Sequence, residues 1–422
     1  MKTSKLIILI SFALCVLTYS CTKTAENKQL DNCSVSIRNF DVLPENSPQV
    51  NKINLQKAID WASERGTALF VEPSEKPYPV EGGIILKKNV SLIGVHGPTP
   101  RGTINPKQKG KPVGSVFSIT DKNNVFITVE SATQIKGIQF WYPEQTIKDP
   151  DKIIPYPATI QSSRSSSTQG VFLSCLTFYG EYLAMDFNGD PKNISELMTF
   201  EHCYGFPLSG EFIRIDYCYD IPRLLHCHVN PAIQRFIGGQ YAPAVVDAVV
   251  AKKTFAYSMN HTDNAQLIDI FTFGTYGGIF LGGDTYGQLT NFNLDCVTVG
   301  IYKKGNNTFN RNWQIAQGSI IANTGEKIND IHPIIIEGEG HTSFTNVESF
   351  SGPNPALSTI KENQSMDFML IKGSEKTTVS LFGCRMRNYV SDTPLTIQNN
   401  RAIVYANGCF DKNENLFALS PM

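Results

Sequence analysis

Short apolar segments alternate with turns rich in glycine, asparagine and aspartate along most of the chain, from about residue 84 onward. Typical segments read VSLIGVHG at 90–97, VFITVE at 125–130 and TTVSLFGC at 377–384. Valine, isoleucine, phenylalanine and threonine dominate them, and these residue types favour β-strands. Stretches with helical periodicity are rare. The pattern therefore predicts an all-β protein built from many short strands.

One strand pattern recurs with its carboxylates in register. Residues 180–190 read GEYLAMDFNGD, and residues 210–220 read GEFIRIDYCYD. In each, an aspartate follows the first glycine by six positions, at Asp186 and Asp216. The same offset recurs at Gly278 and Asp284 and, with an amide, at Gly300 and Asn306. Steps of 30 and 22 residues along this series are typical of solenoids. We therefore expect a parallel β-helix, whose coils stack about 4.8 Å apart.

Strand alternation assigns the side chains of this repeat to two sides of the coil. The predicted inward positions are Leu183, Met185, Phe187, Ile213, Ile215 and Tyr217, and the predicted outward positions are Ala184, Asp186, Arg214 and Asp216. The matching aspartates should then stack on one outer face. Two stacked carboxylates repel each other, so the pKa of one should rise unless a cation lies between them. Gly238, 22 residues beyond Asp216, is expected in the same column.

Two segments depart from the strand pattern. Residues 51–66, NKINLQKAIDWASERG, place apolar side chains at helical spacing and end at a glycine. We expect an amphipathic helix that caps the open N-terminal edge of the coils. The other segment is an insertion at about 240–262. Its Pro243 could begin a helix, but its valines suit a strand equally well, so both alternatives stay open.

The N-terminus has the layout of a secretory signal followed by a lipidation site. Two lysines precede an apolar stretch that begins at Leu6, and a small serine lies just before Cys21. We predict a signal peptide over 1–20, lipid attachment at Cys21, a polar tether over 21–34 and a β-helix domain over 35–422. The apolar stretch is short for a membrane span, so the lipid is the expected membrane contact. The prediction is an exported bacterial envelope lipoprotein that faces the periplasm or the cell surface.

Composition narrows the classes of partner. The 422 residues carry a net charge of −1 and no basic run, which argues against nucleic acid. Of the ten cysteines, six occur singly at predicted strand edges, and we interpret them as small inward-facing fillers rather than disulfides: Cys175, Cys203, Cys227, Cys296, Cys384 and Cys409. Neither a phosphate-binding glycine loop nor a serine-nucleophile elbow is present. The oligomeric state stays open.

Residues 35–97 contain IRNFDV, NLQKAIDWA, GTALFVEP and YPVEGGIILKKNVSLIGV. This series resembles the opening of the pectate lyase superfamily, which includes polygalacturonase-like glycoside hydrolases. The resemblance implies a right-handed single-stranded parallel β-helix with an N-terminal capping helix. It also implies an exported protein that binds acidic or neutral polysaccharide in a groove along one face. The polygalacturonase signatures are missing; GEGHTSF, for example, has Thr342 where a second glycine should follow His341. The resemblance therefore implies the fold but not that chemistry.

Three carboxylates of the repeat, Asp186, Asp216 and Asp284, are the candidate catalytic residues. Two of them could flank a glycosidic bond, as in glycoside hydrolases, and this hydrolase is the first hypothesis. The second is a polysaccharide lyase in which the aspartates bind Ca²⁺ and Arg214 or Lys304 removes the proton beside a uronate carboxylate. Only that alternative requires a metal cofactor. The third is a glycan-binding surface lipoprotein without activity, because Asp and Asn also favour the corners of a coil.

Further residues are candidates for substrate binding. Arg214 and Lys304 could bind uronate carboxylates or neutralise the aspartates. Trp141, Tyr142 and Glu144 belong to an unusual aromatic and proline-rich stretch, which could stack on sugar rings or form a packed turn that covers the coil. His226, in the sequence RLLHCHV, could act as an acid or base, or it could be structural.

Overall fold

The computed structural model describes residues 34–97, 110–306, 311–322, 327–350 and 364–420. The predicted signal peptide and Cys21 lie outside the described residues, as does all of the predicted tether except Ser34. No helix of the described part is long and apolar enough to cross a membrane.

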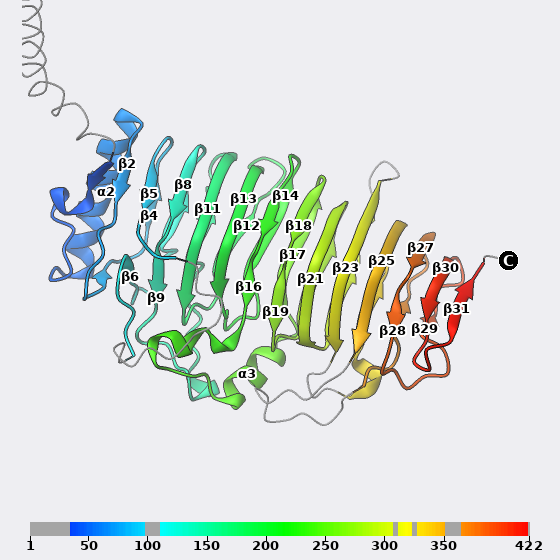
Figure 1. The fold of residues 1–422 in the computed structure, drawn as a ribbon. Helices are drawn as coiled ribbons and strands as arrows, with labels where there is room; N and C mark the ends of the chain where they lie inside the picture. The colour runs from blue at the N-terminus through cyan, green and yellow to red at the C-terminus, as the bar shows by residue number, and fades with distance from the viewer. Residues whose placement is uncertain (1–33, 98–109, 307–310, 323–326, 351–363, 421–422) are drawn as a thin grey trace, which may run out of the picture.

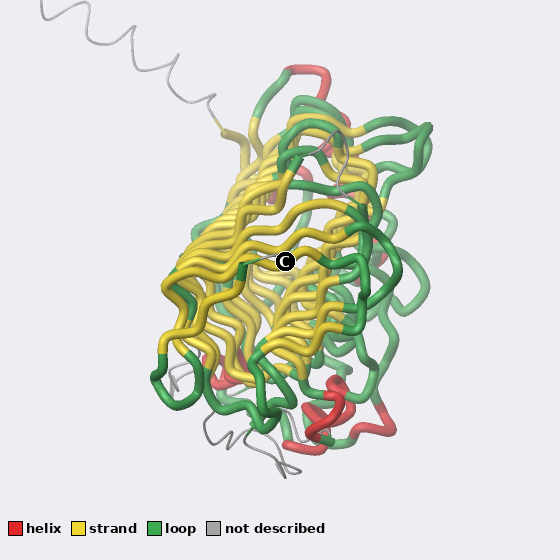
Figure 2. Tube along the Cα trace, turned by 90° about the vertical axis from the view of Figure 1, so that its right-hand side faces the viewer, coloured by secondary structure: helices red, strands yellow, loops and turns green. Residues whose placement is uncertain are grey.

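The strands stack as parallel coils along one axis, and the capping helix covers the N-terminal end (Figure 1). Figure 2 looks along the stack and shows the strands overlying one another around a common interior. The right-handed parallel β-helix that the sequence predicts is confirmed. A single antiparallel pairing occurs among the described strands, between β30 and β31 at the C-terminal end.

Each coil contributes one strand to an eleven-stranded sheet. Its strands are β4 (Ile84–Leu86), β7 (Ile127–Val129), β10 (Ile160–Ser162), β12 (Met185–Asn188), β14 (Ile213–Cys218), β17 (Phe255–Thr262), β20 (Gly277–Gly282), β22 (Val299–Lys303), β24 (His332–Ile336), β26 (Met369–Ile371) and β29 (Leu395–Ile397).

The rest of each coil belongs to a twenty-stranded sheet. Its strands are β1 (Ser34–Ser36), β2 (Ala68–Phe70), β3 (Tyr78–Pro79), β5 (Ser91–Ile93), β6 (Val116–Ser118), β8 (Thr133–Lys136), β9 (Gln139–Trp141), β11 (Thr168–Tyr179), β13 (Ser195–Gly205), β15 (Arg223–Leu225), β16 (His228–Val229), β18 (Ala265–Ile268), β19 (Phe271–Phe273), β21 (Gly287–Val297), β23 (Asn312–Ala322), β25 (Gly340–Phe350), β27 (Thr377–Phe382), β28 (Arg385–Met386), β30 (Ile403–Phe410) and β31 (Leu416–Leu419).

A column of residues with left-handed backbone bends the twenty-stranded sheet into two faces. In successive coils the column contains Cys175, His202, His226, Asp269, Asn291, Gln317 and Asn346, all with φ between 51° and 56°. Asn, Asp and His tolerate this region better than other residues with a side chain. The corner therefore explains why polar side chains recur at one position per coil.

The capping helix is confirmed. Helix α2 (Pro48–Arg65) begins after Ser47, whose side chain accepts a hydrogen bond from the Val50 amide, and it ends at the left-handed Gly66. Its predicted apolar stripe faces the first coil and is buried: Leu55, Ala58, Ile59 and Ala62. Short 3₁₀ helices occur at η2 (Ile37–Phe40), η3 (Pro150–Lys152) and η6 (Ile328–Asp330).

The cysteines of the described part are unpaired, and all but Cys175 are buried. Cys203 and Cys227, for example, lie inside adjacent coils as small side chains. For the buried cysteines the prediction of inward-facing fillers is confirmed, whereas Cys175 lies at the left-handed corner of the coil.

The predicted insertion at 240–262 is wrong at both ends. The inserted segment follows β16 and consists of η4 (Pro231–Ile237) and α3 (Pro243–Val250), and the chain returns to the coil at β17. Gly238 is not an outward coil position, because it terminates η4 with left-handed backbone. The open alternative resolves as a helix, which Pro243 begins.

The register of the repeat differs from the prediction by two residues. Strand β12 pairs with β14 so that Asp186 lies beside Arg214 and Asn188 beside Asp216. The glycines that seem equivalent, Gly180 and Gly210, belong to connections that precede their strands by different lengths. A shift of two preserves the side of the sheet on which a side chain lies. The aspartates therefore share the outer face but are not stacked on each other.

Candidate functional site

Asp186 lies in an ion-pair network rather than beside a second carboxylate. Its side chain is only 12% exposed; Arg214 Nη2 donates to its Oδ2 at 2.8 Å, and Arg164 Nη2 lies 3.0 Å from the same atom. The prediction of stacked, mutually repelling carboxylates is wrong, because an arginine occupies the neighbouring position in the next coil.

Glu211 is a second carboxylate on the same guanidinium. Arg214 Nη1 donates to its Oε2 at 3.3 Å. Burial raises the pKa of Glu211, and the charge of Asp186 adds to this effect, although Arg214 opposes it. Asp186 and Glu211 thus form a close pair of carboxylates that one arginine bridges.

Asp216 forms a dyad with His261, a residue of β17. The Nδ1 atom of His261 lies 2.7 Å from Asp216 Oδ1, which also accepts a hydrogen bond from the Tyr217 amide at 2.9 Å. A carboxylate acceptor holds the proton on Nδ1 and leaves Nε2 as the basic nitrogen. The Tyr217 ring stacks on the imidazole at 4.4 Å with 6° between the planes. Tyr217 was predicted to face inward, but its left-handed backbone, with φ of 53°, breaks the alternation and turns it outward.

His261 forms one wall of a hollow with a glycine floor, which we call the His261 hollow. Its volume is about 330 Å³, and it is lined by His261, Phe280, Gly282, Gly283, Asp284, Lys304, Gly305 and Asn306. The floor has no room for side chains, because a Cβ added at Gly305 would lie 1.6 Å from the Gly283 carbonyl oxygen. Asp284 and Asn306 occupy equivalent positions of adjacent coils, as the 22-residue step predicts. Asp284 lies two positions beyond the column of Asp216.

A second hollow of about 370 Å³ adjoins the first and shares Phe280 with it. Its lining is Asn188, Glu211, Arg214, Lys253, Thr254, Phe255, Ser258, Asn260 and Phe280. Together the two hollows place carboxylates, cations and amides along the outer face of the eleven-stranded sheet. Of the predicted site residues, Arg214, Asp284 and Lys304 line the hollows directly. Asp186 and Asp216 do not line them, but each bonds a residue that does: Asp186 bonds Arg214, and Asp216 bonds His261.

The other predicted binding residues do not lie in these hollows. Tyr142 was predicted to stack on sugars; this is wrong because its ring is buried and its hydroxyl lies 2.7 Å from Thr159 Oγ1. Trp141 is partly buried against the core, and exposed Glu144 pairs with Lys122 at 2.8 Å. The packed-turn alternative describes this stretch better.

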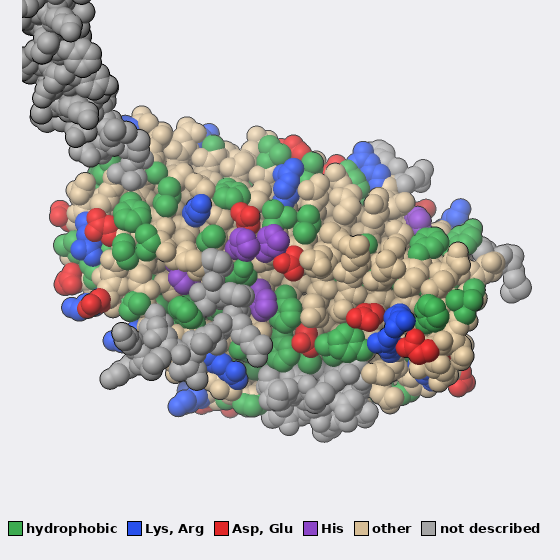
Figure 3. Space-filling model, viewed as in Figure 1, with side chains coloured by type: hydrophobic (Ala, Val, Ile, Leu, Met, Phe, Trp, Pro, Cys, Tyr) green, Lys and Arg blue, Asp and Glu red, His purple; other side chains and the backbone are tan. Residues whose placement is uncertain are grey.

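His226 lies on the twenty-stranded sheet at the left-handed corner. Its Nδ1 atom lies 2.8 Å from Asp269 Oδ2, and its ring stacks on His202 at 4.7 Å. Figure 3 shows histidine side chains gathered over the middle of one face of the molecule. His226 therefore forms a dyad similar to that of His261, but at a different corner of the coil.

Most residues of the two hollows were not predicted, among them His261, Glu211 and Phe280. His261 was assigned to the insertion, so its place one coil after Asp216 could not be seen. Glu211 follows Gly210 as Glu181 follows Gly180, and Glu181 is fully buried. The different burial of these two glutamates depends on how the coils pair, and the sequence pattern did not show this pairing.

Comparison with known proteins supports the fold. No protein-family model matches the chain, and no curated protein is found to be similar. Among solved structures, the Agl-KA catalytic domain aligns with a TM-score of 0.52 at 10% identity, over 90% of this chain and 65% of that one. The fold is a pectate lyase-like parallel β-helix.

Other solved structures superpose less closely. The tailspike of Acinetobacter phage vB_ApiP_P1 aligns with a TM-score of 0.44 at 9% identity, over 92% of this chain and 56% of the tailspike. The A-module of a mannuronan C-5 epimerase from Azotobacter vinelandii gives 0.45 at 10% identity, over 89% of this chain and 99% of the module. This chain thus spans little more than half of the tailspike.

Proposed function

We propose that the protein cleaves a uronate-containing polysaccharide by β-elimination in the His261 hollow. The observation that carries the proposal is the Asp216–His261 dyad at the edge of a hollow that also contains Lys304 and Asp284. The two adjoining hollows follow the stacking direction of the coils, which suits a linear polymer. The resemblance of residues 35–97 to the pectate lyase superfamily implies a polysaccharide substrate, acidic or neutral.

β-Elimination needs a base for the proton at C5 of the uronate and a positive charge near its carboxylate. His261 Nε2 takes the C5 proton, the electron pair of the C5–H bond forms the C4–C5 double bond, and the bond from C4 to the glycosidic oxygen breaks. The imidazolium then returns its proton to the leaving oxygen. Asp216 orients the imidazole and stabilises its charged form, while the Lys304 ammonium faces the substrate carboxylate.

The proposal assigns the neutralising charge to Lys304 rather than to Ca²⁺. Within the described ranges, no group of three or more His, Cys, Asp or Glu side chains is arranged to hold a metal ion. Asp186 is already neutralised by two arginines and Asp216 is bonded to His261, so neither has a free carboxylate for a shared cation. Activity is therefore expected to survive EDTA.

Hydrolysis is the second candidate, and one observation favours it. Asp186 and Glu211 both accept hydrogen bonds from Arg214, and the pKa of Glu211 is raised. Glycosidases use two neighbouring carboxyl groups about 5–9.5 Å apart, one of them protonated. For hydrolysis, Glu211 is the acid and Asp186 is the second carboxylate. This pair differs from the sequence prediction, which drew both carboxylates from Asp186, Asp216 and Asp284.

The test incubates the protein with pectate, alginate and neutral polysaccharides, with and without EDTA, and measures both reducing ends and ultraviolet absorbance. Elimination predicts absorbing, unsaturated products from a polyuronate. His261→Ala should lower kcat/KM by about 10²–10⁴-fold, and Asp216→Asn should lower it less. The matched control is His226→Ala, which removes a histidine from the similar dyad outside the hollow and should leave turnover unchanged.

Other outcomes decide against elimination. New reducing ends without absorbance, lost in Glu211→Gln but kept in His261→Ala, would select hydrolysis. Oligosaccharide binding without turnover of any substrate would select the glycan-binding surface protein.

A further inference from the structure

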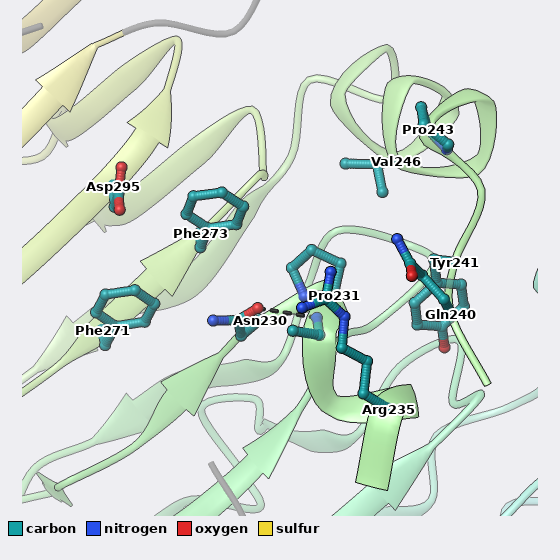
Figure 4. A pocket seen from close by; sticks show the side chains of 11 residues that line it. Asn230, Pro231, Arg235, Gln240, Tyr241, Pro243, Val246, Phe271, Phe273 and Asp295 are labelled. Carbon is teal, nitrogen blue, oxygen red and sulfur yellow. Dashed lines mark hydrogen bonds between the residues drawn. The ribbon is translucent and has the colours of Figure 1, made fainter. Parts of the chain in front are cut away.

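A separate cavity lies between the inserted segment and the twenty-stranded sheet (Figure 4). Its volume is about 220 Å³, and on the side of the sheet it is lined by residues of strands β19 and β21. None of the residues that line it lines the hollows of the eleven-stranded sheet. The cavity is therefore a site separate from the His261 hollow.

The floor of the cavity is an aromatic platform. Phe271 and Phe273 are alternate residues of β19 whose rings are partly exposed, and both point into the space below α3. The imidazole of His228, one coil earlier, stacks on Phe271 at 4.0 Å with 15° between the planes. This stacking holds the Phe271 ring in a fixed orientation. Flat, rigid aromatic rings are suited to packing against the C–H face of a sugar ring.

Polar groups stand around this platform. The Arg235 guanidinium points toward the middle of the cavity (Figure 4) and has no hydrogen bond or ion pair to any described residue. Gln240 lies on the side of the insertion, and Asp295 follows Phe273 in the next coil. Burial raises the pKa of Asp295, whose hydrogen-bonding neighbour is the Cys296 thiol. A partly buried guanidinium without a protein partner, such as that of Arg235, is a donor that a polar ligand would satisfy.

We propose that this cavity is a second binding site that takes one pyranose ring, at the end or a branch of a glycan. The volume exceeds the roughly 150 Å³ that holds a benzene ring and falls below the range of about 300–1,000 Å³ typical of larger ligands. One ring face packs on Phe271 and Phe273. Asp295 and Gln240 bond its hydroxyl groups, and Arg235 bonds a hydroxyl or a uronic carboxylate.

The test is saturation-transfer NMR with methyl glycosides of glucose, galactose and mannose and with galacturonic acid. The background is the double variant His261→Ala, Lys304→Met, which prevents turnover and weakens binding in the His261 hollow. At least one sugar should receive saturation at its ring protons. Val246→Phe, which fills the cavity from α3 without removing a polar group, should abolish the signal. Phe273→Ala should reduce it at least about fivefold, as loss of one stacked ring costs about 1 kcal/mol or more.

The controls separate binding from folding. Phe382→Ala removes an exposed phenylalanine elsewhere on the twenty-stranded sheet and should leave the signal unchanged. Circular dichroism establishes that each variant is folded. Arg235→Gln should remove the signal of galacturonic acid selectively if a carboxylate is bound, and should weaken all sugars equally if it bonds a hydroxyl. The proposal is overturned if no sugar receives saturation, or if the signal persists in folded Val246→Phe.

Discussion

Glu181 should make the stability of the protein fall as the pH rises from about 4.5 to about 8. Its side chain is fully buried, and neither carboxyl oxygen has a hydrogen-bonding partner among the described residues. Burial raises its pKa from 4.5 to about 8, and the nearby amides of Glu181 and Phe206 only partly oppose this. Gly205 makes room for the carboxyl group, since a Cβ there would lie 2.3 Å from Glu181 Oε1.

The sign and size of the effect follow from the two pKa values. Below pH 4.5 the carboxyl is protonated in both states and contributes no pH dependence to the stability. Between 4.5 and 8 only the unfolded chain releases the proton, which favours unfolding by about 1.4 kcal/mol per pH unit. The loss should reach about 3 kcal/mol at pH 7 and about 5 kcal/mol above pH 8. Glu181→Gln removes the titration, so the difference between wild type and variant should show this slope.

The assay is urea unfolding followed by tryptophan fluorescence at a series of pH values from 4 to 9. Only the change of the difference with pH matters, because a buried amide adds a constant cost of its own. Glu75→Gln is the control, since Glu75 is exposed and should leave the pH profile unaltered. A difference in unfolding free energy between wild type and Glu181→Gln that stays flat across the series would refute a protonated, buried Glu181.

Three further predictions concern other parts of the chain. Gly305→Ala should destabilise the protein by at least about 1–3 kcal/mol, because its Cβ would meet the Gly283 carbonyl at 1.6 Å; Gly97→Ala, with nothing within 4 Å, is the control in urea unfolding. Burial lowers the pKa of Lys303 to about 8, so stability relative to Lys303→Met should rise by about 3 kcal/mol between pH 8 and 10.5; a flat difference refutes this. Cys21→Ala should abolish labelling by radioactive palmitate when the chain is expressed in a bacterium, and persistent labelling would contradict lipidation at Cys21.

The sequence was sufficient for the fold because strand alternation and the capping helix depend on local pattern. The capping helix, predicted within residues 51–66, runs over Pro48–Arg65, and the 22-residue step from Asp284 to Asn306 was predicted correctly. In that step, Leu281 pairs with Lys303 and no insertion intervenes. Between β12 and β14 the connection is longer, and an apparent repeat of glycines gave a 30-residue step where the register has 28. Similar sequences at the two glycines do not show how many residues separate each glycine from the strand that follows it, and this number differs between β12 and β14.

For the candidate site, the sequence predicted the face of the coil on which the residues lie, but not which residues contact one another there. Asp186, Asp216, Arg214, Asp284 and Lys304 do lie on one outer surface, because alternation fixes the side of a strand on which a residue lies. Their partners depend on contacts between coils, which residue spacing alone did not supply. His261 was hidden in the predicted insertion, and Tyr217 was turned outward by a left-handed backbone that alternation does not foresee.

A two-residue error in the predicted register leaves the side chains on the same face of the sheet but changes which of them are neighbours, and so changes the chemistry of that face. With the aspartates aligned, the surface would carry repelling carboxylates and require a metal ion or a shared proton. With Asp186 beside Arg214 and Asp216 beside Asn188, each carboxylate instead has a neutralising or neutral neighbour. Asp216 is then available to orient His261, and Glu211, which also bonds Arg214, is a carboxylate whose pKa is raised. The inter-coil register therefore decides between a row of facing carboxylates and a surface on which an aspartate is paired with a histidine.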